Sequence, residues 1–509
     1  MLGKVNSFGL SGLDGYRVDV EVDVSQGLPR YDIVGLPDAS VKESKERVRS
    51  AIKNAGFKFP ESRITVNLAP ASNKKEGPAF DLPIAVAVLS SSKQIQIDES
   101  FKDIIIIGEL GLDGRVKSVN GILPLLISAR DEGFSNFIIP RGNMMEASFL
   151  DGINVFALET LQDVSMFLSR AKQFFPIEKN VWKPETGCNF SEDFARVKGQ
   201  FAAKRAMEIA VAGGHNILLV GPPGSGKTML AKCVPSLLPE LNFEEALEIT
   251  KIHSVAGVLD AAHGVVKSRP FRSPHHTATT PALTGGGKNA KPGEISLAHN
   301  GVLFLDEMPE YQRSTLETLR QPLEDGVITV SRIASTVEYP ASFMLVASMN
   351  PCPCGNFGSR ELDCKCSPSQ IDKYLKRLSG PLLDRIDLKI DVDRVKFFDL
   401  ASESNEEPSS AVRERINAAR EIQRQRFKNE KFHTNAKMSS LAVKKFCKID
   451  KQSEELIEAA FEKFKMSARG FNRILKVART IADLAGEENI LAEHVAEAIS
   501  YRNIENIEL

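Results

Sequence analysis

The stretch Gly221-Pro222-Pro223-Gly224-Ser225-Gly226-Lys227-Thr228 decides the fold of this chain, and it follows directly on the apolar run Ile217–Val220. The run predicts a buried strand and residues 229–238 predict a helix, so the glycine-rich stretch joins a strand to a helix. Such a turn directs several backbone N–H groups toward one point, where they can hold phosphate oxygens. The pattern is a complete P-loop, in which Lys227 is expected to reach the outer phosphates of ATP and the Thr228 hydroxyl to ligate Mg²⁺.

A second apolar run, Val302–Leu305, ends in Asp306 and Glu307. Asp306 is expected to hold Mg²⁺, directly or through water, and Glu307 to polarise the attacking water, because hydrolysis needs an oriented nucleophile beside a neutralised phosphate. Asn350 follows the next predicted strand, residues 343–347, and its neutral amide could position the same water. These residues predict a site that hydrolyses ATP.

The composition sets limits on size and partners. A chain of 509 residues is too long for one core and suggests about two to four domains. Its 65 Lys and Arg balance 66 Asp and Glu, so any nucleic-acid surface must be a local patch. The start lacks the apolar core of a signal peptide, and no apolar run approaches the ~20 residues of a membrane helix. The sequence therefore predicts a cytoplasmic protein without a membrane span.

The expected fold class is multidomain α/β. Residues 1–170 predict an α+β domain, since valines alternate with acidic residues over 18–24 and Asp38 can cap a helix. Residues 171–190 have no clear period and predict a linker. Residues 191–400 carry short continuous apolar runs, typical of a parallel sheet covered on both faces. Residues 411–509 predict a C-terminal helical domain.

The P-loop, the acidic pair and Asn350 together resemble the arrangement of AAA+ ATPases. In that family, the polar residue at the position of Asn350 is called sensor 1. The stretch 380–387 is similar to their arginine-finger segment, with Arg385 as the finger that completes the site of an adjacent subunit. The alternative is a local salt bridge of Arg385 with Asp384 or Asp387. Arg469 resembles sensor 2, which reaches the γ-phosphate from the helical lid.

Further motifs resemble the ComM/YifB family of magnesium-chelatase-like AAA+ ATPases. They are residues 269–277, the glycines and Lys288 of residues 285–288, the predicted hairpin over 326–339, and the ending 468–484. The resemblance covers essentially the whole chain. It implies a homo-oligomeric ring, expected to be a hexamer, that uses ATP to drive branch migration of branched or single-stranded DNA. The processes implied are homologous recombination and natural transformation, with recombination proteins as candidate partners.

In related motors the hairpin and the insert after the P-loop helix line a central pore. Cations on such loops can track a DNA backbone without reading bases. The alternative is that they are charged loops facing solvent. The expected phosphate contacts are Arg269, Arg272, Lys288, Lys291 and Arg332.

The N-terminal domain resembles the Lon protease domain, most clearly over residues 75–81 and 108–116. Lon-type proteolysis needs a serine nucleophile activated by a lysine. The positions that match this pair hold Ala79 and Leu123, and neither side chain can carry out acyl transfer. We therefore expect a scaffold or a DNA-facing collar instead of a peptidase.

Four of the seven cysteines lie close together, as Cys352, Cys354, Cys364 and Cys366. Four thiols are enough to close a tetrahedral, structural Zn²⁺ site, although both pairs have C-x-C spacing in place of the usual C-x₂₋₄-C. The alternative is a set of reduced loop thiols.

Three functions remain open from the sequence, because a fold does not fix a substrate. The first is the ATP-driven DNA motor, favoured by the basic loops and the lost serine-lysine pair. The second is a chelatase-type motor subunit, which needs a large partner. The third is a protein-remodelling ATPase, whose pore loops typically present an aromatic residue, and the hairpin offers only Tyr339.

Overall fold

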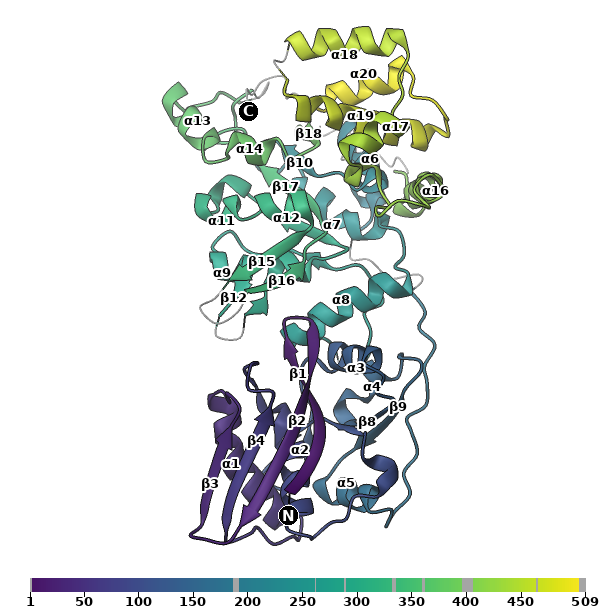
Figure 1. Ribbon diagram of the computed structural model, residues 1–509. Coiled ribbons are helices and arrows are strands. Elements are labelled where there is room, and N and C mark those ends of the chain that lie inside the picture. The colour runs from purple at the N-terminus through teal and green to yellow at the C-terminus, as the bar shows by residue number, and fades with distance from the viewer. Residues whose placement is uncertain are drawn as a thin grey trace.

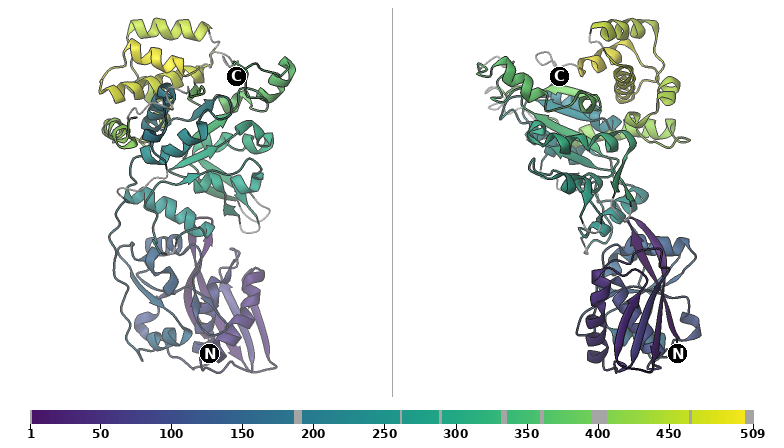
Figure 2. Two further views of the ribbon diagram at one scale, coloured as in Figure 1. Left: turned by 180° about the vertical axis from the view of Figure 1, so that it is seen from behind. Right: turned by 60° about the vertical axis from the view of Figure 1, so that its left-hand side comes forward.

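The computed structural model describes residues 2–185, 192–260, 262–287, 290–331, 336–358, 362–395, 406–463 and 466–502. The molecule is elongated, with an N-terminal sheet at one end, a parallel sheet in the middle and a group of helices at the C-terminal end (Figure 1). In both views of Figure 2, the N-terminal sheet and the C-terminal helices lie at opposite ends of the molecule. Within the described ranges, no helix is long and apolar enough to cross a membrane.

The N-terminal sheet has seven strands in the order β3-β4-β2-β1-β5-β8-β9. Their bounds are β1 (Leu2–Ser11), β2 (Asp14–Ser25), β3 (Arg30–Val34), β4 (Arg63–Ala69), β5 (Ile105–Ile106), β8 (Asn136–Pro140) and β9 (Asn154–Leu158). The predicted valine alternation is confirmed in β2, where Val18, Val20 and Val22 are buried. The two residues of β5 point to opposite faces of the sheet. Ile106 packs in the hydrophobic core on one face and Ile105 in the core on the other.

Helices cover both faces of this sheet. Helices α1 (Ala39–Asn54), α2 (Asp81–Ser91) and α5 (Leu161–Leu168) contribute to one core, and α3 (Ile122–Asp131) contributes to the other. The predicted cap of α1 is confirmed, because the Val41 backbone N–H donates to Asp38 Oδ1 at 2.8 Å. Such a cap satisfies a donor that the first helical turn leaves open. The N-terminal region is therefore a complete α+β unit.

The central sheet has five strands in the order β11-β14-β17-β10-β18, all of them parallel. They are β10 (Ile217–Val220), β11 (Phe271–Arg272), β14 (Val302–Leu305), β17 (Met344–Met349) and β18 (Leu388–Asp391). All four residues of β10 are buried, and they alternate between the cores on the two faces. This burial explains the continuous apolar runs in the sequence.

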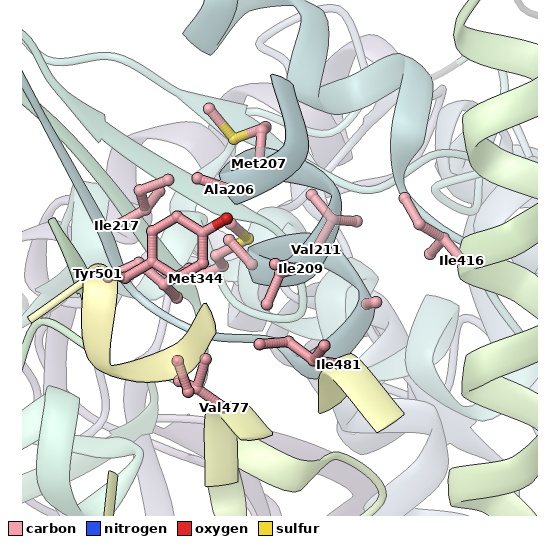
Figure 3. Close-up of a cluster of buried hydrophobic side chains, with 14 of the residues drawn as sticks. Ala206, Met207, Ile209, Val211, Ile217, Met344, Ile416, Val477, Ile481 and Tyr501 are labelled. Carbon is pink, nitrogen blue, oxygen red and sulfur yellow. The ribbon is translucent and has the colours of Figure 1, made fainter. Parts of the chain in front are cut away.

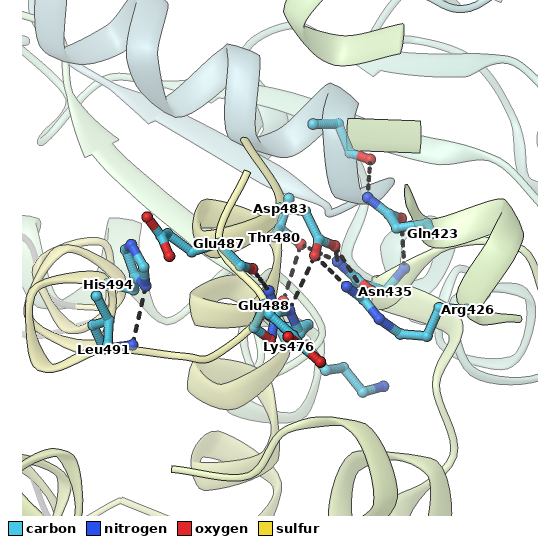
Figure 4. A network of polar contacts seen from close by, with 12 residues as sticks. Gln423, Arg426, Asn435, Lys476, Thr480, Asp483, Glu487, Glu488, Leu491 and His494 are labelled. Carbon is cyan, nitrogen blue, oxygen red and sulfur yellow. Dashed lines mark hydrogen bonds and ion pairs between the residues drawn. The ribbon is translucent and has the colours of Figure 1, made fainter. Parts of the chain in front are cut away.

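The C-terminal helices are α16 (Ser409–Arg426), α17 (Ser440–Phe446), α18 (Lys451–Lys463), α19 (Ala468–Ala485) and α20 (Ala492–Ser500). They pack on the central sheet through α6 (Phe201–Gly213), whose apolar side chains meet Ile416, Ile481 and Tyr501 in one cluster (Figure 3). Beside it, buried Asp483 accepts hydrogen bonds from Arg426 and Asn435 (Figure 4). A buried carboxylate needs such partners, so this network fixes how the helices sit together.

Two connections tie the N-terminal unit to the central one. Helix α8 (Phe243–Ala256) lies against α3, and its Ser254 hydroxyl accepts from the Gly121 N–H at 3.1 Å and donates to buried Glu146 at 2.9 Å. The predicted linker forms neither helix nor strand in its described part, 171–185. Within it, Trp182 donates to the Val266 carbonyl at 3.2 Å, so this segment is anchored to the central unit.

The predicted hairpin is confirmed as β15 (Val327–Ser331) paired antiparallel with β16 (Thr336–Pro340). It reaches toward the N-terminal sheet in Figure 1. A Cβ added to Gly12, in the turn between β1 and β2, would lie 2.4 Å from Val337 Cγ1 of β16. The turn of the β1–β2 hairpin is therefore packed directly on Val337 of β16.

Candidate active site

The P-loop connects the carboxyl end of the internal strand β10 to α7 (Lys227–Leu237). Gly224 and Gly226 have φ angles of 76° and 91°, a left-handed conformation that residues with a Cβ rarely adopt. Successive backbone N–H groups in such a turn form a concave anion site. The P-loop Ser225 is buried, and the Gly221 N–H donates to the Met349 carbonyl of β17 at 3.2 Å. The loop is thus held against the neighbouring strand.

The Lys227 side chain lies inside this loop. Its Nζ donates to the carbonyls of Gly221 and Pro222 at 2.8 Å each, and to Asn350 Oδ1 at 3.3 Å. Burial lowers the pKa of Lys227 to about 8, against the opposing effect of Asp306 and Glu307. Negative phosphates beside the ammonium group favour its charged form. Lys227 and Asn350, predicted from separate motifs, are therefore in contact.

Asp306 and Glu307 follow β14, and β17 lies between this strand and β10. The Thr228 hydroxyl donates to Asp306 Oδ2 at 2.9 Å. A hydroxyl and a carboxylate are the hard oxygen ligands that Mg²⁺ takes, so this pair fits the ion that ATP brings. Glu307 has a φ of 52°, a strained value for a residue with a side chain. Strain of this kind collects at functional sites.

Sequence reasoning missed Ser348, which supports both acidic residues. Its hydroxyl donates to Asp306 Oδ1 and accepts from the Glu307 backbone N–H at 3.1 Å. The register pairs Leu305 with Ala347, which places the next residues of the two strands side by side. Ser348 stands two positions before Asn350, so the alternation along β17 was the signal that could have identified it.

The cysteine cluster lies directly after Asn350. The four sulfur atoms of Cys352, Cys354, Cys364 and Cys366 lie within 4.8 Å of one another. The closest pairs are 3.3 Å and 3.6 Å apart, much longer than the 2.03–2.05 Å of a disulfide. The Phe357 N–H donates to Cys352 Sγ at 3.3 Å. Four converging thiols are a donor set for a soft or borderline metal.

Arg385 and Arg469 meet at one carboxylate. Arg385, just after α14 (Gly380–Leu383), pairs with Glu324 of α12 (Arg320–Asp325), and its side chain is 9% exposed. Arg469 donates to the other oxygen of Glu324 at 3.3 Å. The local alternative named Asp387 as a partner of Arg385, but Asp387 pairs with Arg473 at 2.6 Å. The residues predicted as finger and sensor 2 therefore share a partner that neither motif indicated.

The predicted DNA contacts divide into three groups. Arg269 donates to Glu245 at 2.8 Å and to three backbone carbonyls, and Arg272 binds both oxygens of Glu294 at 2.6 and 2.7 Å. Both guanidinium groups are therefore used within the chain. Lys291 is exposed on the short strand β13 (Lys291–Pro292). Lys288 and Arg332 lie outside the described residues.

The positions assigned to the Lon-type pair lie in the N-terminal unit. Ala79 lines a cleft of about 510 Å³, together with Ser72 and Lys74. Leu123 is fully buried in the apolar core under α3. Lys75 is also buried, and its ammonium group donates to the Asn73 carbonyl at 2.8 Å and to the Pro70 carbonyl. Neither Ala79 nor Leu123 can supply the nucleophile or the base of a serine-lysine pair.

The sheet order, with the polar-ended strand β17 between the P-loop strand and the acidic strand, defines the class as a P-loop ATPase of AAA+ type. Models of magnesium chelatase, subunit ChlI, match residues 193–400, 20–143 and, for its C-terminal part, 406–502.

Three relatives extend this match. Competence protein ComM of Haemophilus influenzae is 44% identical over 506 residues, 98% of this chain and 97% of its own. YifB of Escherichia coli is 41% identical over 507 residues, 99% of this chain and 98% of its own. Lon protease 2 of Bacillus subtilis is 26% identical over 181 residues, about a third (32%) of each chain. The chain belongs to the ComM/YifB family of magnesium-chelatase-like AAA+ ATPases.

Proposed function

We propose that this protein is an ATP-driven ring that moves branched DNA junctions during homologous recombination and the uptake of DNA by competent cells. The observation that carries the proposal is the nucleotide site within one chain, in which the P-loop, Asp306 and Asn350 converge. The printed name of the Haemophilus influenzae relative, a competence protein, supports the biological process. ATP and Mg²⁺ are the substrate and the cofactor of this proposal.

Each site residue then has a role in hydrolysis. The P-loop N–H groups and Lys227 hold the phosphates, and Thr228 with Asp306 holds Mg²⁺, which neutralises phosphate charge when bound. Glu307 accepts a hydrogen bond from the attacking water and orients it in line with the γ-phosphate. Asn350 holds the same water from the neighbouring strand. Ser348 keeps both acidic residues in position through its two hydrogen bonds.

The site is completed in trans. Arg385 and Arg469 both bind Glu324 within one subunit, so two guanidinium groups share one carboxylate. In the ring, we propose that these groups leave Glu324 for the nucleotide of the adjacent subunit. A guanidinium placed beside the transferring phosphate stabilises the charge of the transition state. This arrangement requires a homo-oligomer, which we propose to be a hexamer.

DNA contact is assigned to the loop that carries Lys288 and Lys291 and to the turn of the β15–β16 hairpin. We propose Lys288, Lys291 and Arg332 as phosphate contacts, because cations on loops lose little when they bind a backbone. Arg269 and Arg272 rank behind them, since ion pairs with Glu245 and Glu294 occupy them. The N-terminal unit, residues 1–170, is proposed as a collar, and residues 411–509 as the lid.

The cysteine cluster is proposed to bind structural zinc. Four thiolates give a closed tetrahedral site, and Zn–S bonds of about 2.3 Å imply S···S separations of about 3.8 Å. The sulfur distances of 3.3 and 3.6 Å lie close to that value.

A protein-remodelling function is less well supported. Pore loops that grip polypeptide present an exposed aromatic side chain, and Tyr339 was the candidate. Tyr339 is 1% exposed, and its hydroxyl donates to the Ala290 carbonyl at 2.7 Å. The aromatic ring of Tyr339 is therefore part of the buried core and is not exposed to grip a polypeptide.

The test is ATP-dependent branch migration on synthetic three- and four-stranded junctions. The native protein is compared with Lys227→Ala and Glu307→Gln while ATP turnover is followed in parallel. The proposal predicts that both variants lose migration and turnover. A native protein that hydrolyses ATP but leaves every junction intact would contradict the DNA function and retain the ATPase.

A further inference from the structure

The cysteine cluster touches the nucleotide site at the P-loop itself. Gly355 lies in the turn that follows Cys354, with a φ of 80°. A Cβ added to Gly355 would lie 2.3 Å from Cδ and 2.9 Å from Cγ of Pro223. Those atoms belong to a ring that is bonded to the P-loop backbone, so they cannot rotate away. The turn between the cysteines is therefore packed directly on the phosphate-binding loop.

The segment after the cluster touches two other parts of the site. Helix α13 (Pro368–Leu375) begins two residues after Cys366, and the hydroxyl of its Tyr374 lies against the backbone of Asn350. Arg377 donates to Glu310 at 2.9 Å and to the Pro309 carbonyl at 3.1 Å, just beyond Glu307. The stretch from Cys352 to Arg377 thus contacts the loops that carry Lys227, Asn350 and Glu307.

The chain between Cys354 and Cys364 contains no helix or strand in its described part, residues 355–358 and 362–363. A metal that joins both cysteine pairs closes this loop and orders the residues between them. Among these residues is Gly355, which supports Pro223. Without a metal, the turn is held by the Gly355 N–H, which donates to the Cys352 carbonyl at 2.9 Å, and by Phe357, which packs against the neighbouring core.

We propose that metal bound by Cys352, Cys354, Cys364 and Cys366 sets the position of the P-loop, so that metal occupancy controls nucleotide binding. The inference rests on the proposed ATPase function and on the proposed zinc site, and it adds a regulatory link between them. The link is reciprocal, because two ligands that bind one conformation each raise the affinity for the other. Bound nucleotide therefore raises the affinity for zinc.

The first experiment uses the full-length protein. Zinc content is measured by elemental analysis, zinc is removed with a thiol-selective reagent and a chelator, and excess Mg²⁺ is restored. The affinity for a fluorescent ATP analogue is then compared before removal, after removal and after Zn²⁺ is returned. A displaced P-loop should weaken binding about tenfold or more, and returned Zn²⁺ should restore it.

The second experiment separates the contact from the metal. Gly355→Ala adds the clashing Cβ and leaves all four thiols, so it should keep zinc and still lose nucleotide affinity. Gly56→Ala is the matched control, because Gly56 has a similar φ of 87° but nothing within 4 Å of an added Cβ. It carries the same backbone strain and should bind the analogue as the native protein does. Cys364→Ser should lose both zinc and affinity.

Each outcome decides a different claim. Absence of zinc in protein never exposed to a chelator would overturn the zinc site and the inference with it. A zinc-free protein with an unchanged thermal unfolding temperature and an unchanged affinity for the ATP analogue would overturn the link. It would leave the ATPase proposal intact. Unchanged affinity in Gly355→Ala would overturn the Gly355–Pro223 contact as the route. Loss of affinity in Gly355→Ala with zinc retained would support it.

Discussion

The N-terminal unit and the central unit differ in the side chains that each brings together. Both fold as complete layered units with well-buried sheets. In the central unit, Lys227, Asp306 and Asn350 converge on one P-loop. In the N-terminal unit, Ala79 lines a cleft that Lys291 and Val337 of the central unit also line, and Leu123 is buried in apolar core. The difference teaches that a layered fold supports a reaction only where a few particular side chains converge.

The strongest test of the comparison replaces one carboxylate of the central unit by an amide. Glu307→Gln keeps the shape of the side chain but cannot accept a proton, so ATP turnover should fall at least ~100-fold. Affinity for ATP should remain, since Lys227 and the P-loop are unchanged. Glu421→Gln is the control, because Glu421 of α16 pairs with Arg424 of the same helix. Equal losses in both variants would contradict the role of Glu307.

The acidity of Lys227 provides the next test. Its pKa in the folded protein is lowered to about 8 by burial, so the free protein loses the ammonium group above that pH. Phosphate binds the charged form, and the affinity for ATP should therefore fall about tenfold per pH unit above pH 8. In Lys227→Arg the guanidinium stays charged, and whatever its starting affinity, this decline should disappear. A parallel decline in both proteins would refute the assignment.

Ser348 should have a smaller effect. Ser348→Ala removes the hydrogen bonds to Asp306 and the Glu307 backbone, and misplaced groups lose rate even when the chemistry is intact. We expect turnover about tenfold lower, with a higher Mg²⁺ requirement. Ser348→Thr, which keeps a hydroxyl, should recover most of the loss. Failure of threonine to recover any activity would favour a packing role.

Arg332 tests how the motor contacts DNA. Arg332→Ala should weaken DNA binding several-fold and lower the salt dependence by about one ion, as expected for one lost phosphate contact. Arg269→Ala should instead lower the thermal unfolding temperature, because Arg269 is hydrogen-bonded to Glu245 and to backbone carbonyls. Identical effects of the two variants on salt dependence would show that they act in the same way.

The smallest effect is expected in the N-terminal cleft. Ala79→Ser returns a hydroxyl to the proposed nucleophile position, but Leu123 provides no base beside it. The variant should fold, hydrolyse ATP as the native protein does, and show no peptidase activity on unfolded substrates. Measurable cleavage would mean that another group, such as Lys74 in the same cleft, can activate the hydroxyl.

The sequence predicted features that are local along the chain. The P-loop with its strand and helix, the β15–β16 hairpin and the Asp38 cap each lie within a short window, where periodicity and capping rules apply. Contacts between distant segments were predictable only where both residues belong to recognised motifs, as with Lys227 and Asn350. Glu324 lies 61 residues from Arg385 and 145 from Arg469, and only tertiary packing brings them together.

The same reason applies to the basic residues and to Gly355. A basic residue in a loop motif has the same appearance whether it is free or paired, and the partners of Arg269 and Arg272 lie 24 and 22 positions away. Gly355 resembles any turn glycine until its neighbour, Pro223 of the P-loop, is known. Spacing alone carries no information on such contacts.

The most direct test of the central claim is ATP turnover measured with no added polymer, with branched DNA, with single-stranded DNA and with an unfolded polypeptide. A DNA motor predicts that DNA stimulates turnover, branched junctions most strongly, and that the Lys288→Ala, Arg332→Ala double variant loses the stimulation while it keeps basal turnover. Stimulation by polypeptide with no response to any DNA would contradict the account.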